Sequence, residues 1–262
     1  MEIFDKKLSV SFLVIIHEYS FDSDFERYFI VLNQQNQTPM NLLVIAYIII
    51  GAMEVLAEAT GNSTLRFVTK PLLMPVLMLF YHQSTKLTFS SFDKKIMMAL
   101  FFSWFGDVFL MFVFKNELFF LAGLGSFLLA HIFYVIAFTA VTNKSAEALL
   151  PKKAWILIPL IAYFVMLMVS FFSKVPGEMK IPVAVYSSTI AAMVAMAVNR
   201  YKRVNDKSFS LVMAGALLFM LSDSIIAVNK FLYQGEMAFA GVGIMVLYIS
   251  GQYFIAKGAS KQ

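Results

Sequence analysis

Long apolar segments separated by short polar stretches occupy the chain from residue 40 to near its end. A helix needs about 20 apolar residues to cross the hydrocarbon core of a bilayer. Eight segments approach or reach that length, and we predict membrane-spanning helices at residues 40–59, 67–81, 96–114, 119–141, 155–172, 181–199, 209–229 and 237–256. The pattern therefore predicts an all-α, polytopic membrane domain with eight transmembrane helices at residues 40–259.

The second predicted span is the shortest, and it contains Pro71 and Pro75. Proline has no backbone N–H group and its ring clashes with the preceding turn. We therefore expect this helix to be kinked or partly unwound.

The composition agrees with a membrane protein. Of 262 residues, 60% are hydrophobic and 14% are charged, and the mean hydropathy is +0.76. A soluble domain of this length has no means of burying so much apolar surface, so lipid must be the solvent for most of the chain. The net charge of +5 does not indicate nucleic acid binding, because basic residues in membrane proteins mostly set the orientation. The absence of cysteine excludes disulfides, thiolate metal sites and cysteine nucleophiles.

The first 39 residues form a different kind of segment, polar or amphipathic in character. Their apolar stretch, Leu8 to Ile16, is too short to span a bilayer. It also lacks a small-residue cleavage site, so we do not interpret it as a signal peptide. We expect an extension that lies on the surface or is disordered, or a start site assigned upstream of the true one at Met40.

Basic residues are distributed unequally between the two sides of the predicted spans. One side carries 6 of the 21 Lys and Arg residues, namely Arg66, Lys70, Lys115, Lys174, Lys180 and Lys230. The other 15 lie on the side of both termini. Because Lys and Arg are enriched in cytoplasmic loops, we expect a multi-pass protein of the cell membrane with both termini in the cytoplasm.

Two short motifs recur at a nearly constant distance. Gly106–Asp107 has a counterpart in Ser222–Asp223, 116 positions later, and "AGLG" at residues 122–125 has one in "AGVG" at residues 240–243, 118 positions later. With this offset, the first four predicted spans align with the last four. Since four crossings return the chain to its starting side, the two halves would be parallel repeats about an axis along the membrane normal.

Charged and polar residues lie inside several predicted spans. Asp107 and Asp223 stand in nearly uninterrupted apolar runs, where a carboxylate costs about 2.5–3.5 kcal/mol on insertion scales and usually marks function. The other candidates are Glu54, Glu58, Lys70, His131, Tyr134, Tyr186, Tyr248 and Gln252. The predicted orientation places all of them between the midplane and the outer interface, so we expect them to converge on one polar site.

Structural roles are also open for these residues. The aspartates could serve only as hydrogen-bonding contacts between helices, and His131 could be a satisfied core histidine. Lys70 could extend its ammonium group to the outer interface or pair with a carboxylate. The many Phe and Met residues face lipid or fill the core, and they imply no cofactor.

Five motifs closely resemble, in order, those of the YhhN-like lysoplasmalogenase family. They are "TKPLLMP" (Thr69–Pro75), "WFGDVFLM" (104–111), "GSFLLAHIFYVIAF" (Gly125–Phe138), "GALLFMLSDSIIAVNKF" (Gly215–Phe231) and "YISGQYFI" (Tyr248–Ile255). The similarity covers about residues 41–256. It implies a multi-pass membrane hydrolase that cleaves the vinyl ether bond of lysoplasmalogen to a fatty aldehyde and a glycerophospho-base. The family residues carried over by position are Lys70, Asp107, His131, Tyr134, Tyr186, Asp223 and Gln252.

The chemistry that the resemblance implies suits these residue types. A vinyl ether resists base but hydrolyses once its β-carbon is protonated, which gives an oxocarbenium ion that water captures. Two neighbouring carboxyl groups in a low-dielectric site supply an acid and a negative charge, as in glycosidases. We therefore assign Asp107 and Asp223 as the catalytic pair, without deciding which is the acid, and expect His131 with Tyr134 to orient the water.

The remaining candidates would bind the substrate, a lysophospholipid in the bilayer. Lys70, and with it Arg66, would meet the phosphate near the headgroup level. Glu54, Tyr186, Tyr248 and Gln252 complete the expected substrate-binding set.

Two other functions remain open from the sequence. One is a zinc-dependent lipid hydrolase with Asp107, Asp223 and His131 as ligands; His17 and His82 fall outside the predicted spans, so a three-histidine site inside the membrane is not available. The other is a transporter or lipid-binding protein without catalysis, because parallel repeats and carboxylates at the midplane are also typical of carriers. The headgroup preference and the oligomeric state are not indicated.

Overall fold

The computed structural model describes residues 40–85, 90–143 and 145–262, and in these ranges every regular element is a helix. The long helices are α3 (Met40–Thr60), α4 (Ser63–Thr85), α5 (Ser91–Leu110), α6 (Leu118–Phe138), α8 (Ile158–Phe171), α9 (Lys180–Val198), α10 (Asp206–Phe231) and α11 (Ala240–Ala259). Short turns, namely α7 (Leu149–Lys152), η1 (Ala154–Leu157), η2 (Phe172–Lys174) and η3 (Gly177–Met179), flank α8 and lead into α9. The extension expected at residues 1–39 lies outside the described residues.

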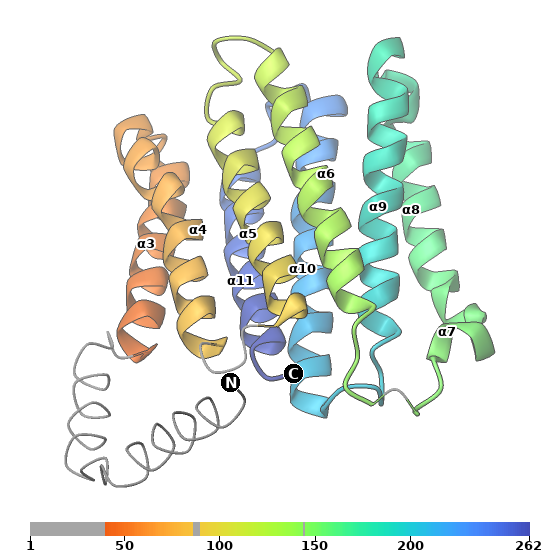
Figure 1. Ribbon diagram of the computed structural model, residues 1–262. Helices are drawn as coiled ribbons and strands as arrows, with labels where there is room; N and C mark the ends of the chain where they lie inside the picture. The colour runs from red at the N-terminus through yellow and green to blue at the C-terminus, as the bar shows by residue number, and fades with distance from the viewer. Residues whose placement is uncertain (1–39, 86–89, 144) are drawn as a thin grey trace, which may run out of the picture. The chain divides into compact units, whose positions relative to one another are not determined.

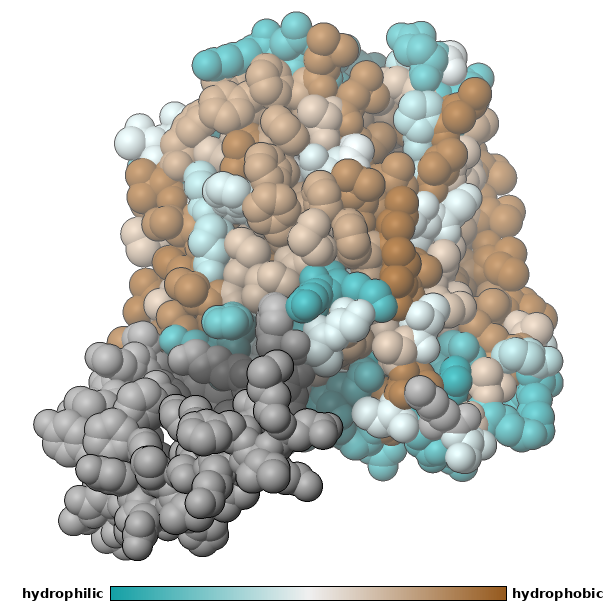
Figure 2. Space-filling model, in the orientation of Figure 1, coloured by the Kyte–Doolittle hydropathy of each residue, from teal (hydrophilic) through white to brown (hydrophobic). Residues whose placement is uncertain are grey.

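Seven helical segments in the described part are long and apolar enough to cross a membrane. The helix outside this set is α5, which carries Asp93, Lys94 and Lys95 near its start and Asp107 near its end. Its apolar residues lie between these charges, and it packs between α4 and α6. Figure 2 shows mostly apolar side chains over the middle of the helices and hydrophilic residues at their two ends. The protein is thus an all-helical membrane protein, as predicted, with α5 as its eighth long helix.

The helices pair in the same way in the two halves of the chain. In the first half α5 packs against α6 and α4 against α5, and in the second half α10 packs against α11 and α9 against α10. The halves join through matching contacts, α9 with α6 and α4 with α11. Figure 1 shows the result, with α5, α6, α10 and α11 at the centre, α3 and α4 on one flank and α8 and α9 on the other. This arrangement agrees with the parallel four-helix repeats expected from the motif spacing.

The second span is not unwound at its prolines, because α4 is a continuous helix of 23 residues through Pro71 and Pro75. A proline leaves the carbonyl four residues earlier without its helical hydrogen bond, and for Pro75 that carbonyl belongs to Pro71. The indole Nε1 of Trp104 on α5 donates to it at 2.9 Å. Since His82 lies in the last turn of α4, its expected position outside the spans was wrong.

Helix caps explain why α5 starts at Ser91 and not at the predicted residue 96. The Ser90 side chain accepts a hydrogen bond from the Asp93 backbone, and the Asp93 carboxylate accepts one from the Ser90 N–H at 2.7 Å. This capping box satisfies amide groups that are otherwise unpaired at a helix start. The Tyr81 hydroxyl also donates to Asp93, at 2.6 Å. Hydropathy does not detect such polar caps.

One arginine counted as a loop cation is fully buried beyond the end of α9. The guanidinium of Arg200 donates to Gln262 Oε1 at 2.7 Å and to Ser208 Oγ at 2.9 Å, and it lies over the rings of Phe92 and Phe138. Burial lowers its pKa to about 10, so the side chain still carries its charge at neutral pH.

Small residues allow the central helices to approach closely. A Cβ atom added at Gly215 on α10 would lie 2.6 Å from the carbonyl oxygen of Gly251 on α11. At Gly106 it would lie 2.6 Å from the ring of Phe127. Ser222 instead ties two helices together, since its hydroxyl donates to the Ile244 carbonyl at 3.1 Å.

Candidate active site

Asp223 on α10 lies at the centre of a buried polar cluster formed by three helices. Its Oδ2 accepts a hydrogen bond of 2.8 Å from the hydroxyl of Tyr186 on α9. The Nε2 atom of His131 on α6 lies 3.4 Å from the same oxygen, longer than an ordinary hydrogen bond. Asp223 is 6% exposed and His131 is fully buried. The structure therefore brings together three of the residues that were expected to converge on one polar site.

Asp107 on α5 has a similar setting in the other half of the chain. Its Oδ2 accepts a hydrogen bond of 2.7 Å from the hydroxyl of Tyr248 on α11, and the carboxylate is 5% exposed. The two aspartates are 116 positions apart, and their neighbours His131 and Tyr248 are 117 apart (248 − 131). The repeat thus makes Asp107 equivalent to Asp223. It also makes His131, which contacts Asp223, equivalent to Tyr248, which contacts Asp107.

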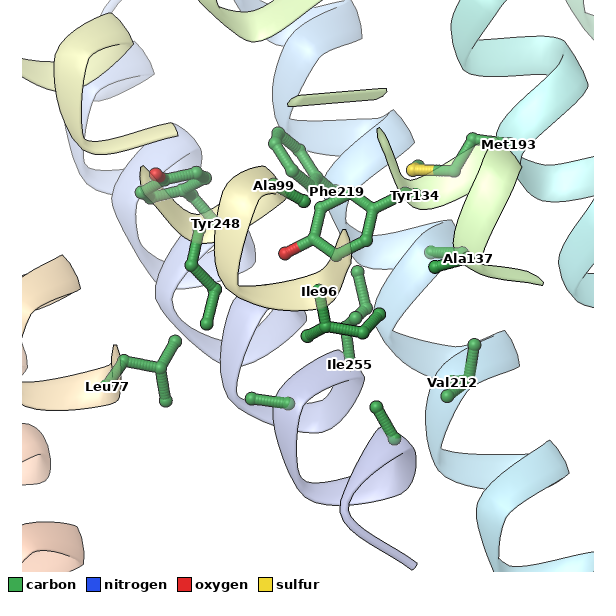
Figure 3. Packing of buried hydrophobic residues seen from close by; sticks show 14 of the residues in the cluster. Leu77, Ile96, Ala99, Tyr134, Ala137, Met193, Val212, Phe219, Tyr248 and Ile255 are labelled. Atoms are coloured by element: carbon green, nitrogen blue, oxygen red, sulfur yellow. The ribbon is translucent and has the colours of Figure 1, made fainter. Parts of the chain in front are cut away.

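An aromatic ring lies between these two clusters. Phe219 has its ring centre 4.7 Å from that of His131 and 5.3 Å from that of Tyr248, and Figure 3 shows Phe219 and Tyr248 in the buried core. Within the described ranges, no hydrogen bond or ion pair joins Asp107 directly to Asp223. Asp107 and Asp223, which were expected to form a carboxyl pair, are therefore not bonded to each other. Each accepts a hydrogen bond from a different tyrosine.

Tyr134 belongs to a third polar group. Its hydroxyl donates to Gln252 Oε1 at 2.6 Å, and Gln252 Nε2 donates to Ser103 Oγ at 3.0 Å. All three side chains are buried. Tyr134 and Gln252 are 118 positions apart, the offset of the repeated glycine motif, so equivalent helices of the two halves meet here. Sequence reasoning missed Ser103, since a single serine in an apolar helix carries no signal of its own.

The charged residues of α3 and α4 form a fourth group. Lys70 Nζ lies 3.3 Å from Glu54 Oε1 and 3.2 Å from Glu58 Oε1, and Arg66 lies 3.5 Å from Glu58 Oε2. Glu54 is fully buried and also accepts a hydrogen bond from Thr69. Lys70 is therefore paired with carboxylates. The hydrogen bond between Trp104 and Pro71 places this group close to the level of Asp107, one turn further along α5.

An apolar pocket opens beside Asp223. Its cavity volume is about 50 Å³. Asp223, Tyr186, Ser187 and Ser224 are its polar lining residues, and the rest of the lining is Leu110, Phe120, Leu124, Phe127, Phe164, Leu167, Phe171, Val183, Ile190, Ile226, Ala227 and Phe231. Asp107 does not line this pocket.

A basic pocket adjoins the apolar one, and the two share Leu110, Phe120 and Ile226 in their walls. Its polar side chains are Glu58, Arg66, Lys70, Asn229 and Lys230. Sequence reasoning had counted Lys230 only as an outer loop cation. It lies in the last turn of α10, two turns from Asp223. The sequence feature that could have singled it out is that few basic residues were expected on the outer side.

The described residues contain no group of three or more His, Asp and Glu side chains arranged to hold a metal ion. His131 and Asp223 are neighbours, but the Asp107 carboxylate bonds to Tyr248 on another helix pair. The ligand set of the zinc alternative is therefore not assembled at one point.

Comparison with known proteins gives one match. The YhhN family matches over residues 65–259, which covers α4 to α11 and every polar group above except the two glutamates of α3. No curated protein and no solved structure is similar enough to be matched. The chain belongs to the YhhN family.

Proposed function

We propose that this protein is a membrane-embedded hydrolase that cleaves the vinyl ether bond of a lysoplasmalogen. The observation that carries the proposal is the position of Asp223, a buried carboxyl group in the wall of an apolar pocket that adjoins a basic pocket. Family membership supports a function of this kind. A lysolipid has the matching parts, one hydrocarbon chain and one phosphate-bearing headgroup.

The two pockets suggest how such a lipid would bind. Arg66, Lys70 and Lys230 line the basic pocket with one carboxylate, Glu58, and would hold the phosphate through charge-assisted hydrogen bonds. The hydrocarbon chain would occupy the apolar pocket. The linkage between glycerol and chain would then lie near the shared wall of Leu110, Phe120 and Ile226.

In the proposed mechanism Asp223 is the general acid. Its proton goes to the vinyl ether carbon remote from oxygen, which leaves an oxocarbenium ion at the carbon next to oxygen. Water adds to that carbon and returns a proton to Asp223. The resulting hemiacetal breaks its bond to the glycerol oxygen, which takes up the hydroxyl proton, and releases the aldehyde. One water molecule is consumed.

The neighbouring residues would support these steps. His131, 3.4 Å from the Asp223 carboxylate, would orient the water. Tyr186 would hold the carboxyl group in place through its 2.8 Å hydrogen bond. Asp107 would remain ionised, close to the level of the cation Lys70, and stabilise the positive charge of the oxocarbenium ion. Tyr134 and Gln252, bonded to each other, would stabilise the helices and not contact the substrate.

The location follows from the distribution of basic residues. We propose that the protein resides in the cell membrane with both termini in the cytoplasm, so that the basic pocket opens near the outer interface.

The test is aldehyde release by the purified protein in lipid nanodiscs. A lysoplasmalogen should yield a fatty aldehyde, whereas the saturated 1-alkyl lysophospholipid, which has no double bond to protonate, should yield none. Lipid binding without aldehyde release would support the alternative of a carrier or lipid-binding protein. Loss of activity with a chelator and its recovery with zinc would support the metal-dependent alternative.

A further inference from the structure

A groove runs between α8 and α9 on the flank of the protein. Its volume is about 510 Å³. Its lining consists of Leu157, Leu160, Ile161, Phe164, Val165, Met168, Val169, Ala184, Ser187, Ser188, Ala191, Ala192 and Ala195. Apart from two serines, every lining residue is apolar, so hydrocarbon fits this groove and a charged ligand does not.

The two walls of the groove differ in the size of their side chains. The α9 wall has only alanine and serine, while η1 and α8 contribute leucine, isoleucine, valine, methionine and phenylalanine. α8 is also weakly attached to the other helices: Met166 is 65% exposed and Val169 is 78% exposed. Because large side chains lie opposite small ones, neither wall fills the space between α8 and α9. In a bilayer, the exposed side chains of α8 would contact lipid.

The groove adjoins the apolar pocket of the candidate active site. Phe164 and Ser187 line both. Ser187 directly follows Tyr186, whose hydroxyl donates to Asp223. Phe164 and Ser187 therefore stand between the groove at the outer face of α8 and α9 and the pocket that Asp223 lines.

We infer that this groove is the lateral portal through which the hydrocarbon chain of a lysolipid passes from the bilayer to Asp223. Phe164, half-buried where the groove meets the pocket, is the residue that the chain must pass. The inference deepens the proposed function and rests on it for the identity of the lipid.

The test uses a 1-alkyl lysophospholipid that carries a photoreactive diazirine near the end of its chain and has no vinyl ether bond to hydrolyse. The full chain in nanodiscs is illuminated with this probe, and the labelled residues are mapped by mass spectrometry. We expect labelling of the groove residues of α8 and α9 that excess unlabelled lysolipid reduces at least tenfold. Labelling that excess lipid does not compete, or that is equal on all lipid-facing helices, would overturn the portal.

Two matched substitutions on α9 sharpen the test. Ala191→Phe fills the groove without touching the apolar pocket, and it should reduce both groove labelling and kcat/KM for a long-chain lysoplasmalogen at least tenfold. Val185→Phe adds a ring to the same helix at a residue that is 48% exposed and does not line the groove; it should change neither. Equal effects of the two variants would contradict the portal.

A third variant covers the case in which Ala191→Phe does not fold. Phe164→Ala widens the junction and should increase labelling inside the pocket at least threefold, and unchanged labelling would count against the portal. The outcomes also separate the two proposals. No aldehyde from the wild type with saturable groove labelling would refute the hydrolase alone, whereas aldehyde release with an unlabelled groove would refute the portal alone.

Discussion

The hydroxyl of Tyr186 on α9 donates a hydrogen bond of 2.8 Å to the carboxylate of Asp223 on α10. The same contact recurs at the aspartate of the other half of the chain, since Tyr248 on α11 donates to Asp107 on α5 at 2.7 Å. The two carboxylates differ in what else they face. Asp223 lines the apolar pocket and has His131 beside it, whereas Asp107 has neither. The two aspartates thus share a tyrosine donor, and the pocket distinguishes between them.

The substitution of either aspartate by asparagine tests the proposed roles. Asp223→Asn and Asp107→Asn keep the side-chain shape but remove the titration, and each should lower aldehyde release by about 10²-fold or more, the usual contribution of a positioned acid–base group. The double variant should lose little beyond the worse single one, because residues that act as a unit are not additive. Specific activity and the yield of monodisperse protein are measured together. Poorly folded variants with near-normal turnover per folded molecule would instead support a purely structural role.

Removal of the tyrosine donors tests which carboxyl group is the acid. Tyr186→Phe deletes the hydrogen bond to Asp223 and should lower kcat about tenfold, since a hydrogen bond to a charged group contributes about 1.5–3 kcal/mol. Tyr248→Phe is the matched control at Asp107 and should have the smaller effect. Steady-state kinetics on folded protein gives the comparison. A larger loss for Tyr248→Phe would transfer the acid role to Asp107.

Substitution of Lys230 tests where the phosphate of the headgroup binds. Lys230→Ala should raise KM for lysoplasmalogen about tenfold with little change in kcat, because one charge-assisted hydrogen bond to phosphate is lost. Lys115→Ala is the control, since Lys115 is also expected on the outer side but does not line the basic pocket. If the two variants behave alike, the phosphate does not bind in that pocket.

The close contact of α10 and α11 predicts a difference between two glycines. Gly215→Ala places a methyl group 2.6 Å from the Gly251 carbonyl oxygen, and the forced separation should cost about 1–3 kcal/mol. At Gly125 a Cβ atom has no neighbour within 4 Å, so Gly125→Ala should be neutral or stabilise the helix by up to about 1 kcal/mol. Thermal unfolding in detergent compares the variants, and equal midpoints would show that α10 and α11 pack less closely than described.

The membrane orientation is tested with reporters. Tags at either terminus should be inaccessible from outside the cell, and a reporter between Lys174 and Lys180, in the η2–η3 connection, should be exposed. Termini on opposite sides would remove the eight-helix arrangement and, with it, the parallel repeat.

For the described residues, the sequence alone determined the order and class of the long helices. In a bilayer, backbone groups must be satisfied within the segment that spans it, so a long apolar run already implies a helix. Apolar runs located the eight long helices of the described residues, although α5 is not among the seven segments apolar enough to span a membrane. Spacing between Gly106–Asp107 and Ser222–Asp223 also predicted the repeat. Helix ends were less predictable, because they depend on polar caps such as Ser90 with Asp93 and on one distant donor, Trp104, which satisfies the carbonyl that Pro75 leaves free.

The tertiary structure decided which polar residues meet. Sequence position together with orientation gives the depth of a residue in the membrane, but not the direction in which its side chain leaves the helix or the neighbour that it finds there. His131 and Tyr134 were therefore expected together, yet His131 lies beside Asp223 and Tyr134 bonds to Gln252. The pockets likewise combine residues from several helices that are distant in the chain. Depth depends on the chain and the bilayer, whereas the partner of each side chain depends on how all the helices pack.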